Sequence, residues 1–117
     1  MEGQEQGDSG ELGQGDSTEL GGNITLVGFK EVDRAEFVVV KKIIGSYTRK
    51  LSDTVPGFER ITVTLKSVHK TEEGHPKFEL HAKAIVSGKP LASEVVERNL
   101  FVGLDDVLKK VLVMASK

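Results

Sequence analysis

Three histidines are the side chains in this sequence that come closest to a metal site. His69, His75 and His81 are spread along the chain without the short spacing that metal ligands show. Glu79 would share a strand face with His81, but two ligands do not complete a site. The sequence contains no cysteine, which excludes disulfides, thiolate nucleophiles and cysteine-ligated clusters. We therefore expect no metal site and no cofactor.

Acid–base and nucleophilic catalysis find equally little support. Asp105 and Asp106 are adjacent in a predicted helix, where neighbouring side chains diverge by about 100°, so these carboxylates cannot converge on a substrate. Both would lie early in that helix, where acids stabilise the helix dipole. Ser46, Ser67 and Ser87 belong to no motif that marks a nucleophile. We therefore predict no catalytic residues and no enzymatic activity.

The basic side chains form a more informative pattern on the first predicted helix. Opposite its apolar stripe the sequence places a basic face made of Lys41, Lys42, Gly45, Thr48 and Arg49, with Lys50 at the margin. Lys and Arg gathered on one helix face are suited to phosphate contacts. The same pattern also fits an ordinary solvated helix surface.

Further bases lie near the second predicted helix. Lys109 and Lys110 could extend the first helix's basic face if the two helices lie side by side, and Arg98 lies just before that helix. Cations near a helix C-terminus also stabilise the dipole, which is the alternative role for Lys109, Lys110 and Lys117. A mixed set on the predicted hairpin could contact RNA or protein or face solvent: Thr64, Lys66, Glu79, His81 and Lys83.

The elements that must position these residues follow from hydrophobic periodicity. Residues 24 to 29 alternate as a short first strand. Asp33 is suited to cap a helix from Arg34 to about Asp53. One buried face of that helix is indicated by residues at three-and-four spacing: Phe37, Val40, Ile44, Tyr47 and Leu51.

A hairpin, a short strand and a second helix follow. Residues 61 to 66 alternate as a second strand, a polar turn spans Thr71 to Pro76, and Phe78 to Val86 alternate as a third strand. Gly88-Lys89 forms a tight turn before a short edge strand over Pro90 to Ser93. The second helix runs roughly from Asn99 to Ala115, with one apolar side: Leu100, Phe101, Leu104, Val107, Leu108 and Val111.

This order predicts an α+β fold, β-α-β-β-β-α, with two helices packed on one face of a four-stranded sheet. At 117 residues the chain fits one domain, which we place at residues 23–117. Residues 1–22 contain six acids, seven of the 13 glycines and no Lys or Arg, and so predict a disordered acidic Gly-rich tail. Two roles are open for it: a solubilising leader, or competition with a polyanion for the basic face.

Charge and hydropathy also limit where the protein can be located and which partners it can have. Without the tail the chain has 12 acids and 16 bases, a difference of 4 positive charges. The first residues resemble neither a signal nor a transit peptide. The apolar runs are far shorter than the about 20 residues of a membrane span. We therefore expect a cytoplasmic protein without a membrane association.

Several segments of the second half carry a family resemblance. In order they are His69, Gly74, Phe78-Glu79-Leu80-His81-Ala82, Gly88, Leu91-Ala92-Ser93-Glu94, and Asn99 to Val107 followed by Leu108-Lys109-Lys110. Their order and spacing resemble the ribosome hibernation-promoting factor family. Members typically have a His before a Gly-containing turn, a Phe-Glu-Val-type strand, an Ala-Ser-Glu after the next turn, and an Asp-Leu-Tyr-Ala-Ala-Ile-Asp helix start. The resemblance covers about residues 24 to 113 and indicates a short form or a divergent relative.

The resemblance implies a fold similar to double-stranded-RNA-binding domains and a stress-response factor that inhibits translation. Such a protein would bind rRNA in the decoding region of the small ribosomal subunit and block messenger and transfer RNA. The bases expected to contact RNA are Lys41, Lys42, Arg49, Lys50, Arg98, Lys109, Lys110 and Lys117. We expect a monomer or weak dimer and no small-molecule substrate. The alternative is a binding module of the same fold for another structured RNA or a protein.

Overall fold

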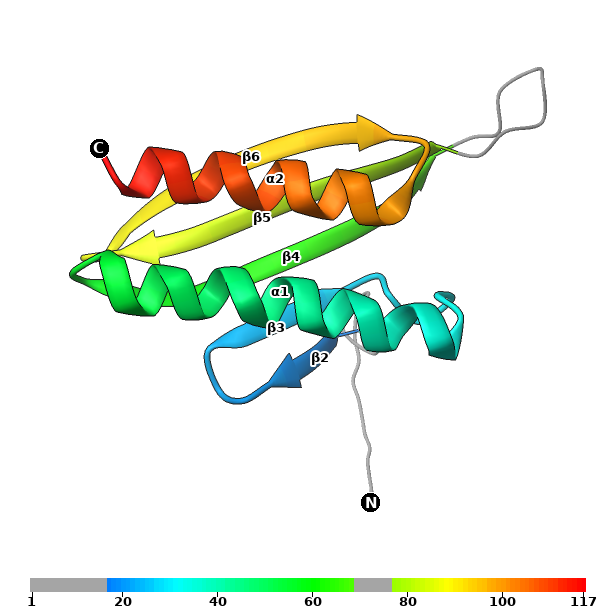
Figure 1. The fold of residues 1–117 in the computed structure, drawn as a ribbon, viewed down its shortest axis with the longest axis horizontal. Coiled ribbons are helices and arrows are strands. Elements are labelled where there is room, and N and C mark those ends of the chain that lie inside the picture. Colours follow the sequence, from blue (N-terminus) through cyan, green and yellow to red (C-terminus); the bar gives the residue numbers. More distant parts are fainter. Residues whose placement is uncertain (1–16, 69–76) are drawn as a thin grey trace.

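Two helices lie side by side on one face of a five-stranded sheet in the computed structural model of this chain, which describes residues 17–68 and 77–117 (Figure 1). The elements in chain order are β2 (Ser17–Leu20), β3 (Ile24–Val27), α1 (Arg34–Thr54), β4 (Phe58–Val68), β5 (Lys77–Val86), β6 (Lys89–Glu97) and α2 (Leu100–Ala115). The predicted α+β class and both helices are confirmed.

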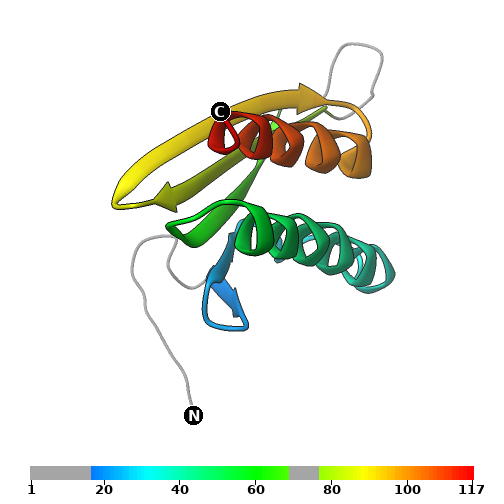
Figure 2. The same ribbon diagram turned by 60° about the vertical axis from the view of Figure 1, so that its left-hand side comes forward.

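The sheet order is β2-β3-β4-β5-β6, so neighbours in sequence are neighbours in space. Only the β3–β4 pair is parallel, and α1 provides the crossover that a parallel connection requires. The other pairs are antiparallel. Turned by 60°, the sheet is visibly twisted, and both helices remain on the same side of it (Figure 2).

The predicted sheet of four strands is wrong by one, because β2 adds a fifth strand at the edge. This strand comes from the end of the segment that composition assigned to the disordered tail. Gly21 and Gly22 take φ values of +67° and +87°, which glycine adopts without steric cost, and they turn the chain back so that Leu20 pairs with Ile24. Residues 17–20 therefore belong to the sheet and Gly21-Gly22 to its turn, while the prediction for residues 1–16 lies outside the described residues.

Helix α1 begins where the sequence predicts, with the Asp33 carboxylate accepting a hydrogen bond from Ala35 N at 3.1 Å. Its buried residues are Val40, Ile44, Thr48 and Leu51. The placement of Thr48 on the basic face is therefore wrong. Its side chain is only 5% exposed, and its hydroxyl is satisfied by donating to Ile44 O one turn earlier at 2.8 Å.

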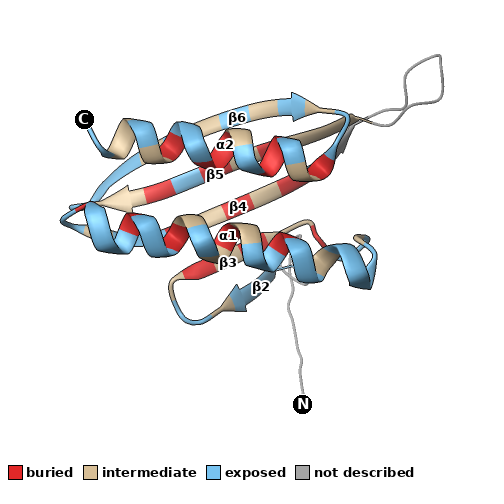
Figure 3. Ribbon diagram, viewed as in Figure 1, coloured by how far each residue is buried: buried red, intermediate tan, exposed pale blue. Residues whose placement is uncertain are grey.

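Helix α2 supplies more of the core. The Asn99 side chain caps it by accepting from Phe101 N at 2.9 Å and Val102 N at 3.1 Å. Its buried residues are Leu100, Gly103, Leu104, Val107, Leu108 and Val111. Helix α2 packs on β5 and β6, and its buried residues join those of α1, β3, β4 and β5 in one core; buried positions are red in Figure 3.

The strands of the hairpins show the predicted alternation but are longer than the sequence predicts. Strand β6 continues to Glu97 instead of ending at Ser93, and Ser87 and Gly88 form its turn with positive φ values of 51° and 79°. The predicted turn over Thr71 to Pro76 lies outside the described residues. Within residues 17–68 and 77–117, neither helix is long and apolar enough to cross a lipid bilayer.

Candidate nucleic-acid interface

The outward side of α1 carries four exposed bases: Lys41, Lys42, Arg49 and Lys50. We call this set the α1 basic face. Because the helix buries Val40, Ile44 and Leu51 against the sheet, these bases are held pointing away from the core. In the described part of the chain, none of the four forms an ion pair with a carboxylate. Their charges are therefore available to an external anion.

Two of these bases lie over aromatic rings of the same helix. The Lys41 ammonium is 5.3 Å from the centre of the Phe37 ring, and the Lys50 ammonium is 5.7 Å from that of Tyr47. Such contacts hold a lysine stem on the helix surface while leaving its charge in solvent. Lys42 and Arg49 are seven residues apart, so their side chains project in nearly the same direction, from the outermost side of the helix. They form the centre of the α1 basic face.

Acids of α2 border the α1 basic face where the helices meet. The Tyr47 hydroxyl donates to Asp105 Oδ1 at 2.6 Å. Burial, this hydrogen bond and the charges of Asp105 and Asp106 together raise the pKa of Tyr47 to about 12. Asp105 thus stabilises the helix pair as a hydrogen-bond acceptor. Asp105 is exposed and directed at Tyr47 of α1, and Asp106 is half-buried.

The bases late in α2 do not extend the α1 basic face. Lys110 lies on the flank of α2 away from α1, and its ammonium is 3.4 Å from Glu94 O on β6. Lys109 lines the same groove as Lys110, described next. Sequence spacing left this point open, because it does not reveal which flank of α2 faces α1.

A groove of about 940 Å³ lies over the outer face of the sheet, the face turned away from the helices. It crosses the edge strand β6 and ends on the flank of α2. We call it the outer-face groove. Its charged lining residues are Lys66, Lys83, Lys109, Lys110 and Glu94. The alternation of β4 and β5 indicated the outward direction of Lys66 and Lys83, but the groove itself requires the folded sheet.

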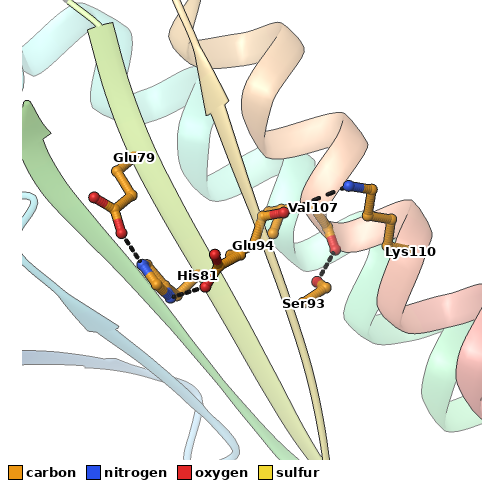
Figure 4. A network of polar contacts seen from close by, with 6 residues as sticks. All are labelled: Glu79, His81, Ser93, Glu94, Val107 and Lys110. Carbon is orange, nitrogen blue, oxygen red and sulfur yellow. Dashed lines mark hydrogen bonds and ion pairs between the residues drawn. The ribbon is translucent and has the colours of Figure 1, made fainter.

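His81 lies in this groove between two carboxylates (Figure 4). Its Nε2 is 2.6 Å from Glu79 Oε2, and its Nδ1 is 3.5 Å from Glu94 Oε1. Because each ring nitrogen is directed at a different carboxylate, the three groups do not converge on a common point. In the part of the chain that the structure describes, no cluster of His, Asp and Glu has the geometry of a metal site.

Arg98 and Lys117 lie apart from both basic surfaces. Arg98 precedes α2 and lines a pocket of about 380 Å³ together with Glu31 and Glu36, whose carboxylates reduce the local positive charge. Lys117 is exposed at the end of the chain. The eight bases singled out from the sequence are thus distributed over separate surfaces: four lie on α1, Lys109 and Lys110 line the outer-face groove, and Arg98 and Lys117 lie apart.

The three serines that the sequence analysis set aside as nucleophiles lie on separate elements. Ser46 is exposed on α1, Ser67 lies in β4, and Ser87 forms the β5–β6 turn. A serine that the sequence did not single out, Ser93, donates to Val107 O at 2.7 Å and ties β6 to α2 (Figure 4).

Comparison with known proteins gives a structural match. No family model matches the chain, and no curated protein matches it in sequence. A ribosomal subunit interface protein from Coxiella burnetii is similar in structure, with a TM-score of 0.53 and 12% identity over 80% of this chain and 91% of that one. At this identity the match shows a shared fold. The neighbour's name agrees with the family that the sequence motifs resemble.

Proposed function

We propose that this protein binds the small ribosomal subunit and inhibits translation as a hibernation factor, without catalysis. Two independent lines support a ribosomal partner. The motifs of the second half resemble the hibernation-promoting factor family, and the fold is shared with a ribosomal subunit interface protein. A ribosome-bound role in turn implies a cytoplasmic location.

The observation that carries the proposal is the α1 basic face. Four bases project from one helix, and none is paired with a carboxylate in the described residues. Each phosphate neutralised by such a base releases a condensed counterion, so affinity arises without any chemical step. A helix held rigidly against a sheet also presents its bases at fixed spacing, which limits the entropy lost on binding.

Within this proposal α1 faces the rRNA of the decoding region and blocks the path of messenger and transfer RNA. Its acidic border at Asp105 and Asp106 would then lie beside the contact area and help to fix the orientation, because carboxylates are repelled by phosphates. Arg98, Lys109, Lys110 and Lys117 would add contacts only where the rRNA extends beyond α1.

Sedimentation with purified ribosomal subunits tests the proposal. The full chain should co-sediment with small subunits at low salt and reduce their binding of transfer RNA. The variant Lys42→Glu/Arg49→Glu should lose most of this binding, since it reverses both central charges of the α1 basic face. The matched variant Lys77→Glu/Lys89→Glu has the same net charge and should retain more. Absence of wild-type binding to small subunits, or binding only to large ones, would reject the proposal.

A further inference from the structure

The outer-face groove has a charge imbalance, and two of its lysines, Lys66 and Lys83, have no part in the proposed function. Lys66, Lys83 and Lys109 are exposed and form no ion pair with the described residues, and Lys110 reaches only a main-chain oxygen. Among the described residues one carboxylate lines the groove, that of Glu94, and it is directed at His81. The groove therefore presents a positive surface that runs from the outer face of the sheet, where Lys66 and Lys83 lie, around β6 to Lys109 and Lys110 on α2.

The floor of the groove is mainly apolar where β6 and α2 line it, whereas Thr62 and Thr64 line it on β4. It includes Ala92, Met114 and Val113, whose side chain is 51% exposed. The described residues that line the groove include one aromatic ring, that of His81, whose two nitrogens are directed at carboxylates, so the groove offers no row of aromatic rings on which nucleic-acid bases could stack. Lysines around an aliphatic floor suit an acidic polypeptide with small and aliphatic side chains better than they suit RNA.

An acidic segment with small and aliphatic side chains precedes the strand that leads into the groove. Residues 1–16 contain five acids, no Lys or Arg, five of the glycines and Leu12. Strand register places Ser17 in one row across the sheet with Val27, Thr64, His81 and Glu94. Residues of one row share a face, so the chain enters β2 on the row that leads into the groove.

The length of residues 1–16 is also sufficient to reach across the sheet to the groove. Adjacent strands are about 4.8 Å apart, so Ser17 lies roughly 10 Å from Thr64 and 19 Å from Glu94 along this row. The 16 residues before Ser17 could span up to about 50 Å when extended, which is more than the whole width of the sheet. The tether also gives the segment an effective concentration on the order of millimolar at the groove.

We propose that the acidic segment, residues 1–16, docks in the outer-face groove of its own chain. Its carboxylates lie along Lys66, Lys83 and Lys109, and its small residues and Leu12 cover the apolar floor. Docking there holds five negative charges on the face of the sheet opposite α1. The α1 basic face is then free of competition from the chain's own acids.

Paramagnetic broadening in the full chain tests this docking without any ribosome. The protein has no cysteine, so Gly10→Cys accepts a single nitroxide label. At low salt we expect selective loss of amide signal intensity at Thr64, Lys83 and Ala92, with α1 amides retained. The loss should disappear at about 1 M salt, where the Debye length is about 3 Å.

Two labelled double variants locate the contact. Lys66→Glu/Lys83→Glu should restore the groove signals, whereas Lys42→Glu/Arg49→Glu, with the same change in charge, should leave the broadening in place. Broadening centred on α1, or none at low salt, would overturn the proposal. So would broadening that appears only between chains, in a mixture of spin-labelled unenriched protein and isotope-enriched unlabelled protein, because the occupant would then be a second copy.

Discussion

The two helices pack on the same face of the sheet but use their residues differently. Helix α2 buries six of its 16 residues, and its outward side includes exposed Val102 and Val113. Helix α1 buries only four of 21. It also exposes two valines, Val38 and Val39, but its solvent side carries four bases: Lys41, Lys42, Arg49 and Lys50. The difference indicates that α2 mainly stabilises the fold, whereas α1 mainly supplies a binding surface.

The largest expected effect tests the structural role of α2. Leu104 is fully buried, so Leu104→Ala should lower the free energy of unfolding by about 2–5 kcal/mol through lost burial and a residual cavity. Val102 on the same helix is 47% exposed, and Val102→Ala should change stability by no more than about 0.5 kcal/mol. Urea unfolding measures both. Equal losses at the two positions would contradict the assigned packing of α2.

The glycines of the two helices provide a sharper comparison. A Cβ added at Gly45 of α1 meets nothing within 4 Å, whereas one at Gly103 of α2 would lie 2.7 Å from Leu80 Cδ1 and 3.1 Å from Glu97 Cβ. Gly45→Ala should therefore stabilise the protein by about 0.5–1 kcal/mol, the gain in helix propensity.

At Gly103 the same gain is opposed by overpacking, which typically costs about 1–3 kcal/mol, so Gly103→Ala should destabilise relative to Gly45→Ala. Thermal or urea unfolding of the two single variants gives the difference directly. A stabilising Gly103→Ala would mean that α2 does not approach β5 as closely as described.

The sequence predicted both helices well but not β2, the strand at the N-terminal edge of the sheet. Periodicity over many residues identified α1 and α2, and Asp33 and Asn99 marked where they begin. Strand β2 was missed because its four residues, Ser17–Leu20, are few compared with the glycine-rich acidic segment before them. Gly21-Gly22 was the signal for a turn, and composition obscured it.

The candidate surfaces were less predictable than the elements. Thr48 lies at the border of the buried stripe, where a small difference in helix rotation decides its burial. The direction of Lys110 depends on which flank of α2 faces α1, and the Tyr47–Asp105 hydrogen bond fixes that only in the folded protein. Long-range packing of this kind leaves no local trace in the sequence.

A change of similar size to that at Gly45 is expected from removing the hydrogen bond that joins the helices. Tyr47→Phe should lower stability at neutral pH by about 0.5–1.5 kcal/mol, since it removes one hydrogen bond to a charged acceptor at the surface. The pKa of Tyr47 is raised from 10.0 to about 12 in the folded state. Its contribution is therefore complete below pH 10 and is lost as the pH rises toward 12.

The free energy of unfolding, measured across this pH range, should fall more steeply for the wild type than for Tyr47→Phe. The free energies of the two proteins should converge at the alkaline end. A constant difference between them at all pH values would show that the hydroxyl does not titrate with folding.

The salt dependence of small-subunit binding tests the central claim most directly, because it counts phosphate contacts. Neutralising the centre of the α1 basic face with Lys42→Gln/Arg49→Gln should make the plot of log K against log salt shallower by about 1.4–1.8, at roughly 0.7–0.9 per phosphate contact. Lys77→Gln/Lys89→Gln should leave the slope near that of the wild type. Equal slopes for the wild type and the α1 variant would contradict binding through α1.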